Sequence, residues 1–200
     1  MGVAVKPLRV RQAEATRELL ISTARELFAE RGFAGTSIED IIERAGVARG
    51  ALYHHFNGKD ALFRAVYDAV QAEAVSRIVA TALAQSEPWD AVRAGLSAFL
   101  DVCLDPAFRR IVILDSVPVL QSQAWDTGIE HSELPMMRSI LTPLTAGEVL
   151  PGVALEPLAH VALGGLYGAG LYIALSPDPE AARAEAESVI DTIIRGLRST

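Results

Sequence analysis

The sequence has little of the chemistry on which secreted domains and most enzymes depend. One cysteine, Cys103, stands alone in 200 residues, so no disulfide can form within the chain, which suits a reducing cytoplasm. We find no Cys/His spacing typical of a bound metal, no phosphate-cradling glycine loop and no Gly-x-Ser-x-Gly motif. A carboxylate site could in principle be built from Asp101, Asp105, Asp115, Glu130 and His131. We therefore expect no catalytic residues, no metal and no cofactor, and an enzyme is the less favoured alternative.

Low-complexity linkers are also lacking, because glycine and proline are spread along the chain. A net charge of −7 is unfavourable for binding nucleic acid, but the charge is unevenly distributed along the chain. Residues 1–60 hold nine Lys/Arg and eight Asp/Glu, a net charge of +1, whereas residues 61–200 hold nine against seventeen, a net charge of −8. An acidic surface repels nucleic acid. Any DNA-binding domain is therefore expected within residues 1–60, and residues 61–200 are expected to form a second, regulatory domain.

Two short helices joined by a glycine-containing turn are expected between residues 36 and 57. The first begins at a capping box, Thr36-Ser37-Ile38-Glu39, and has one apolar face before Gly46 ends it. The second is expected over residues 49–55, with Leu52 and Phe56 facing inward. This arrangement is typical of a helix-turn-helix, in which the second helix enters the major groove of DNA.

The motif as a whole resembles the signature of the TetR family of bacterial transcriptional regulators. The resemblance lies in the order and spacing of Thr36, Ile41, Ala45-Gly46-Val47, Gly50, Leu52-Tyr53, His55-Phe56 and Lys59. It covers about residues 11–70. Two positions depart from the pattern: Ala48 replaces the usual capping Ser or Thr, and Ile42 replaces the usual Ala. The resemblance implies an all-α protein, with an N-terminal three-helix DNA-binding domain and a C-terminal helical domain for ligand binding and dimerisation.

The residues expected at the DNA surface are Thr36, Ala48, Arg49, Gly50, Ala51, Tyr53, His54, His55 and Lys59. Arg49 is the best candidate for reading a base, since a guanidinium can pair with guanine through two hydrogen bonds, although a phosphate contact is the alternative. Gly50 and Ala51 are small enough for close approach. The resemblance implies phosphate contacts for Tyr53 and His55 and a base or sugar contact for His54; packing against neighbouring helices is the alternative for Tyr53 and His55. Lys59 and Thr36 are expected to hold phosphates on either side.

Residues 1–10 are interpreted as a basic arm, with a tail of no function as the alternative. Helices are expected over residues 11–31, 60–85 and 89–104, and the middle one is long enough to connect two domains. The run Ile111-Val112-Ile113-Leu114 could be a strand, but helical neighbours favour a helix.

An effector cavity is expected in the second domain, where side chains with apolar bodies and polar tips gather around residues 119–145. Ordinary helix packing is an equally good interpretation of these residues. The candidate pocket residues are Phe99, Cys103, Phe108, Trp125, His131, Met137, His160 and Tyr167.

Residues 158–175 form an uncharged run of 18 residues, a marginal candidate for a membrane span. Lys/Arg anchors are absent from its flanks and His160 interrupts it, so a soluble interface helix is the preferred interpretation. With the last helix, residues 180–197, it could form a four-helix bundle between two subunits, as the resemblance implies. The candidate interface residues are Leu166, Leu171, Ile190, Ile193, Ile194 and Leu197.

Together these observations predict a cytoplasmic, homodimeric transcriptional regulator of a bacterium. We expect a repressor that binds a palindromic operator in double-stranded DNA and is released by a small-molecule effector, without a membrane partner. A DNA-binding regulator whose second domain only dimerises or binds a protein is the alternative.

Overall fold

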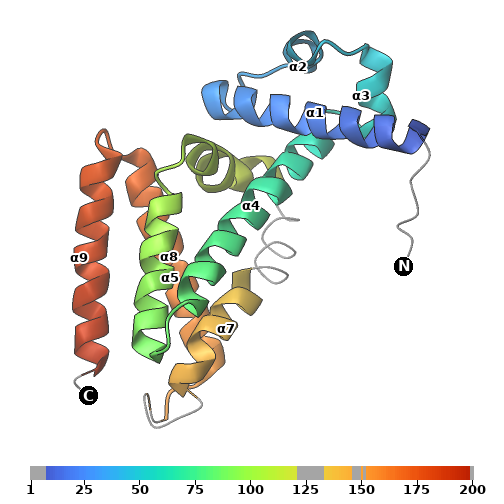
Figure 1. The fold of residues 1–200 in the computed structure, drawn as a ribbon. Helices are drawn as coiled ribbons and strands as arrows, with labels where there is room; N and C mark the ends of the chain where they lie inside the picture. Colours follow the sequence, from blue (N-terminus) through green and yellow to red (C-terminus); the bar gives the residue numbers. More distant parts are fainter. Residues whose placement is uncertain (1–7, 121–132, 146–149, 151, 199–200) are drawn as a thin grey trace, which may run out of the picture.

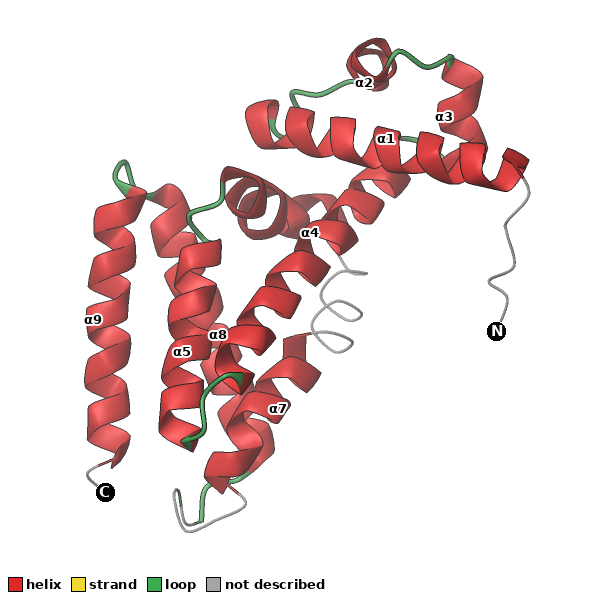
Figure 2. Ribbon diagram, in the orientation of Figure 1, coloured by secondary structure: helices red, strands yellow, loops and turns green. Residues whose placement is uncertain are grey.

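A computed structural model describes residues 8–120, 133–145, 150 and 152–198 of the chain. Every regular element in these ranges is a helix (Figure 2). They are α1 Leu8–Arg31, α2 Ile38–Ala45, α3 Arg49–His55, α4 Lys59–Leu83, α5 Pro88–Val102, η1 Phe108–Asp115, α7 Leu134–Thr145, α8 Leu155–Leu175 and α9 Pro179–Arg198. Helices α1 to α3 form a small head, and α5 to α9 form a larger body (Figure 1). The all-α fold class is confirmed.

The head is built around one face of α1. Leu20, Ala24, Leu27 and Phe28 are buried on that face, as their spacing predicts. Gly32 ends the helix with a φ of +72°, a backbone conformation that residues other than glycine rarely adopt. The same cluster includes Ile41 of α2, Leu52 of α3 and Phe56. The three-helix core expected from the sequence is therefore present.

Helix α4 connects the head to the body. Its 25 residues span about 37 Å at 1.5 Å per residue, and it runs from beneath the head into the body (Figure 1). Phe63, near its start, packs edge-on against Phe28 and Phe33, with ring centroids 5.2 Å and 5.0 Å away. Its later turns bury Val70, Ala74 and Ile78 in the body. The long connecting helix that the sequence predicts is confirmed.

The run from Ile111 to Leu114 lies in η1, a π-helix, so the prediction of a helix rather than a strand is confirmed. Asp105 begins this region, because its carboxylate accepts hydrogen bonds from the backbone N–H groups of Ala107 and Phe108 at 2.7 Å and 3.1 Å. Nothing in the spacing of these residues predicts the wider π form. Such wide turns are frequent at functional sites.

Helices α8 and α9 pack on one another and on α5, and α8 also packs on η1. This packing determines which of their apolar side chains are exposed. Leu166 and Ile194 are 6 % and 7 % exposed, so they belong to the core of their own chain. The prediction that these two residues lie at a subunit interface is therefore wrong, because neither side chain is on the surface of the chain. Leu171, Ile193 and Leu197 are exposed, and Ile190 is half-buried against the core.

Candidate nucleic-acid interface

Helix α2 begins one residue later than expected. Ser37 is its N-cap: the Ser37 hydroxyl accepts from the Asp40 N–H at 3.0 Å, and the Asp40 carboxylate accepts from the Ser37 N–H at 2.9 Å. The capping box therefore uses Ser37 and Asp40, not Thr36 and Glu39. Hydrogen bonds from Ser37 hold the pKa of Asp40 below its usual value, so this carboxylate stays charged where the helix dipole favours it.

Thr36 lies inside the head and not on its surface. Its side chain is 2 % exposed, and its hydroxyl donates to the carbonyl oxygen of Gly32 at 2.8 Å or Leu27 at 3.2 Å. The expectation that this hydroxyl holds a phosphate is wrong for this conformation, because the group faces the interior. Thr36 instead secures the loop that joins α1 to α2.

Lys59 begins α4 and ties it to the same loop. Its ammonium donates to the carbonyl oxygens of Phe33 and Thr36, both at 2.9 Å, and lies 4.0 Å from the centroid of the Phe33 ring. An ammonium has three N–H donors, so one is left over for a phosphate. The predicted phosphate contact of Lys59 stays a prediction, and its structural role was not foreseen.

Helix α3 presents one face to the core and the opposite face to solvent. Leu52 is fully buried and fixes the helix in the head, whereas Arg49, Gly50, Tyr53 and His54 are exposed. Among the described residues, nothing beyond the backbone of α3 and the two chain neighbours of Gly50 lies within 4 Å of where a Cβ at Gly50 would stand, so this surface is open to a close partner. The exposure of Tyr53, at 46 %, argues against the packing alternative. Ala48 precedes the helix without a side-chain cap, as expected.

Arg49 is held in place by a neighbouring helix. Its guanidinium donates to the Glu39 carboxylate of α2 at 2.7 Å and lies 5.6 Å from the centroid of the Tyr53 ring. Both members of the ion pair are 61 % exposed, and a pair on an exposed surface contributes little to stability because water screens it. A weak pair of this kind leaves the Arg49 guanidinium able to exchange the Glu39 carboxylate for a partner outside the chain.

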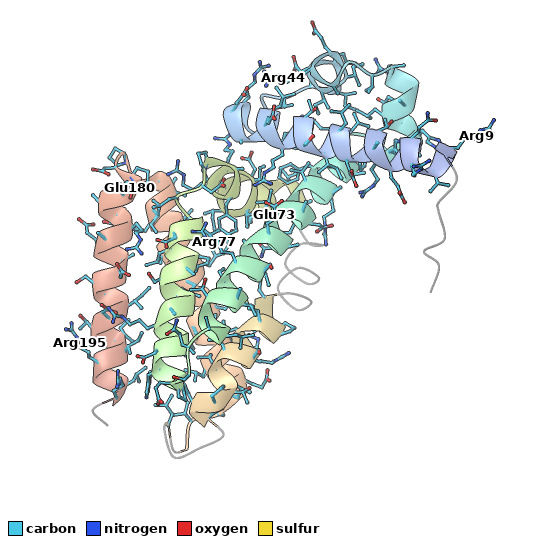
Figure 3. All side chains as sticks on the ribbon, viewed as in Figure 1. Arg9, Arg44, Glu73, Arg77, Glu180 and Arg195 are labelled. Atoms are coloured by element: carbon cyan, nitrogen blue, oxygen red, sulfur yellow. The ribbon has the colours of Figure 1, made fainter. Side chains whose placement is uncertain are left out.

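Arg49→Ala is expected to weaken binding to the specific operator more than binding to random DNA, by about 1–3 kcal/mol, because a base contact carries sequence information and a phosphate contact does not. Fluorescence anisotropy on both duplexes at several salt concentrations measures the difference. Arg77→Ala, on α4 and far from the head (Figure 3), is the matched control. An equal loss of affinity for both duplexes would show that Arg49 contacts a phosphate and not a base.

A shallow hollow of about 350 Å³ lies between the start of α1 and α3, lined by Arg9, Val10, Ala13, Glu14, Arg17 and His55. Arg9 lies at the free end of α1 (Figure 3), and the Arg17 guanidinium stands 5.3 Å from the centroid of the Phe56 ring. Burial, with the nearby charges of His54 and Arg17, lowers the pKa of His55. His55 is therefore neutral at pH 7 and has one N–H to donate.

Sequence reasoning missed Arg17, although the signal was present. Arg9 and Arg17 are eight residues apart, just over two helical turns, which places them on one face of α1 beside α3. Two arginines beside the recognition helix suit the phosphates that flank a major groove.

The candidate pocket residues are only partly brought together. Phe99, Cys103 and Phe108 meet beside Gly170 of α8, where a Cβ would lie 3.3 Å from Phe99 and 3.4 Å from Cys103. Burial raises the pKa of the Cys103 thiol to about 12, so this group is an inert part of the core. The hydroxyl of Tyr167 donates to the carbonyl oxygen of Ile113 at 3.3 Å.

The other pocket candidates lie elsewhere in the fold or outside the described residues. Met137 is buried in a separate cluster with Leu134 and Leu141. His160 is exposed, with Nδ1 2.9 Å from the carbonyl oxygen of Glu156, so its assignment to an internal pocket is wrong. Trp125 and His131 lie outside the described residues. Sequence reasoning also missed two polar residues of the body, Gln71 and Glu133, which the structure joins by a hydrogen bond.

A helix-turn-helix head with an exposed recognition helix, carried on an all-helical body, defines a DNA-binding transcriptional regulator. Comparison with known proteins agrees in both parts of the chain. Residues 20–66 match the model of bacterial regulatory proteins of the TetR family, and residues 89–197 match the tetracycline repressor-like C-terminal domain. The chain belongs to the TetR family.

Among solved structures, a TetR-family transcriptional regulator from Pectobacterium atrosepticum is 32 % identical, with a TM-score of 0.83 over 95 % of this chain and 97 % of that one. Among curated relatives, the regulator TtgR of Pseudomonas putida is 37 % identical over 103 residues, 50 % of this chain and 49 % of its own. The transcriptional repressor AcnR of Corynebacterium glutamicum is 30 % identical over 135 residues, 60 % of this chain and 72 % of its own. The chain spans about half the length of the first curated relatives it matches.

Proposed function

We propose that this protein is a cytoplasmic repressor that binds a palindromic DNA operator as a homodimer and leaves it when a small molecule enters the body. The observation that carries the proposal is the open face of α3, on which Arg49, Tyr53 and His54 stand exposed around Gly50. A gel shift on DNA from beside its own gene, repeated over a panel of small metabolites and drugs, tests it. A sequence-selective shift that one compound abolishes supports the proposal, and a shift that none disturbs favours a body that only dimerises or binds a protein.

A second copy of the chain is the proposed partner of the exposed face of α8 and α9. Helix α8 is long and apolar enough to cross a membrane, with a mean hydropathy of 1.5, yet only 22 % of its apolar window is buried within the chain. The large apolar side chains that remain exposed on these two helices are Val161, Leu171, Tyr172, Leu175, Val189, Ile193 and Leu197. Membership of a family of DNA-binding regulators supports a subunit interface over a lipid-facing surface.

The body contacts the head through Asp115 at the end of η1. Its carboxylate accepts from the backbone N–H of Phe33 at 2.7 Å and from the Arg110 guanidinium at 3.1 Å, and its side chain is 13 % exposed. The guanidinium also lies against Gly32, where a Cβ would stand 2.1 Å from its nitrogen. Gly32 is therefore needed both for its left-handed φ and for this close approach.

This contact offers a route by which a ligand in the body could move the head. A ligand can shift an equilibrium only if it binds one conformation better than the other. A compound that displaces η1 acts directly on Asp115, and through Phe33 on the loop that Lys59 and Thr36 also secure. We infer that η1, together with α4, carries the effect of the ligand to the recognition helices.

Asp115→Ala is expected to destabilise this junction by about 1–3 kcal/mol, because it leaves the partly buried Phe33 N–H without an acceptor. Amide hydrogen exchange should show faster exchange at Phe33 and in the α1–α2 loop. Asp68→Ala is the control, because Asp68 also pairs with an arginine, Arg64, but on an exposed surface, and its loss should change stability by less than about 0.5 kcal/mol. If the Phe33 amide in Asp115→Ala exchanges as slowly as in the wild type, Asp115 does not stabilise the contact between the head and the body.

A further inference from the structure

Two polar residues face one another in the body, Gln71 buried and Glu133 partly buried. Gln71 lies on α4 with 8 % of its surface exposed, and its side-chain amide donates to the carboxylate of Glu133, one residue before α7 begins. Among the described residues, no lysine, arginine or histidine forms an ion pair with Glu133. Burial raises the pKa of Glu133, as expected for a carboxyl group without a cationic neighbour.

The pair leaves hydrogen-bonding capacity unused. The side-chain oxygen of Gln71 is buried and has no hydrogen-bond partner in the described part of the chain. A buried acceptor without a donor loses its hydrogen bonds to water and gains none in the protein, so such groups are rare in folded proteins unless they serve a purpose. Among the described residues, the pair therefore offers a buried acceptor without a donor next to a carboxylate without a cation.

Two tyrosines lie near the pair, one on α4, the helix that also carries Gln71, and one on α8. Burial, together with the smaller effect of the nearby Glu133 charge, raises the pKa values of Tyr67 on α4 and Tyr167 on α8. Tyr167 reaches η1 through its hydrogen bond to the carbonyl oxygen of Ile113, two residues from Asp115. The acceptor pair thus lies among α4, η1, α7 and α8, next to the element that contacts the head.

We propose that Gln71 and Glu133 form the polar end of the effector site and that the effector is an organic amine with an apolar body. Its ammonium N–H groups donate to the free oxygen of Gln71 and to the Glu133 carboxylate, while its apolar part lies against Tyr67 and Tyr167. A neutral alcohol supplies one donor and leaves the carboxylate charge without a partner, and a carboxylate ligand is repelled. The proposal rests on the ligand response proposed above and adds the chemical class of the ligand.

The test compares amines with uncharged and anionic analogues of the same body on the full-length protein. Hexylamine and phenylbutylamine are each measured against the matching alcohol and carboxylate, by the rise in melting temperature and by calorimetric titration. We expect the amine of a series to bind and the carboxylate not to bind. Glu133→Gln and Gln71→Leu should each weaken amine binding roughly tenfold or more, the loss expected for a hydrogen bond to a charged group. Glu180→Gln, at the exposed start of α9 (Figure 3), should leave it unchanged.

The melting temperatures of the variants without ligand provide a second test. If the pair exists for a ligand, Glu133→Gln should melt at the same temperature as the wild type or higher, since it removes a buried charge without a cation. A lower melting temperature together with unchanged amine binding would make the pair purely structural and overturn the proposal. Equal binding of amine and alcohol, or no binding by any amine, would overturn it as well.

The same samples, tested on operator DNA, separate this proposal from the function on which it rests. An amine that binds through Glu133 and releases the operator supports both. Amine binding by a protein that shows no sequence-selective DNA binding supports the site and contradicts the repressor.

Discussion

Ile193→Asp is expected to convert the proposed dimer to a monomer and to weaken operator binding roughly 100-fold or more, the advantage that joining two binding modules typically provides. Ile193 is 57 % exposed on α9, beside Val189 and Leu197, at successive helical turns. In the proposed two-fold interface, a carboxylate at this position would bring two like charges together and bury both. Because the side chain is exposed within its own chain, the fold of the monomer should survive.

Analytical ultracentrifugation measures the first effect and anisotropy on operator DNA the second. Ser188→Asp is the control, because Ser188 is exposed on the same helix but lies about 140° around it from Ile193. The control should remain a dimer. Ile193→Asp protein that still sediments as a dimer would show that the interface lies elsewhere on the molecule.

Phe63→Ala is expected to destabilise the protein by about 3–5 kcal/mol, the usual result of removing a buried phenylalanine ring. Phe63 is fully buried at the start of α4 and contacts the rings of both Phe28 and Phe33. Its loss leaves a cavity where α4 meets α1 and the loop that positions α2. Specific DNA binding should therefore fall together with stability.

Denaturant unfolding of the variant and the wild type measures this effect. Leu83→Ala, at the other end of α4 and 70 % exposed, should change stability by less than about 0.5 kcal/mol. A loss below about 1 kcal/mol for Phe63→Ala would mean that the head does not depend on its contact with α4.

The head could be predicted from the sequence because its determinants are local. The face of α1 repeats at helical spacing, and Gly32 and Gly46 stand at its end and at the end of α2, both with positive φ. Leu52 and Phe56 were expected inward for the same reason and are buried. Such periodicities and caps need no knowledge of distant residues.

The start of α2 shows where local signals become ambiguous. The segment Thr36-Ser37-Ile38-Glu39-Asp40 contains two overlapping capping boxes, one that starts at Thr36 and one that starts at Ser37. The carbonyl oxygens of Leu27 and Gly32 decide between them, because they engage the Thr36 hydroxyl in the interior and leave Ser37 to cap the helix. Only the folded head brings these groups together.

The body was less predictable because its polar contacts join residues far apart in sequence. Asp115 and Phe33 are 82 residues apart, and Gln71 and Glu133 are 62 apart. In the sequence, Asp115 and Glu133 resemble ordinary solvated acids. Similarly, apolar spacing alone did not distinguish Leu166, which packs inward, from Leu171, which is exposed. Burial of these side chains depends on how the helices pack, which local patterns do not specify.

Selection of bound duplexes from a random-sequence DNA pool by the purified protein tests the central claim most directly. If the protein is a dimeric DNA-binding regulator, one inverted repeat should be enriched. The centres of its half-sites should lie one helical turn of DNA apart, about 34–36 Å, or a multiple of that distance, because two copies of α3 must enter major grooves on one side of the DNA. Arg49→Ala should also relax the preference at one position of each half-site. A pool that shows no enrichment, or the same enrichment with Arg49→Ala as with the wild type, would contradict this claim.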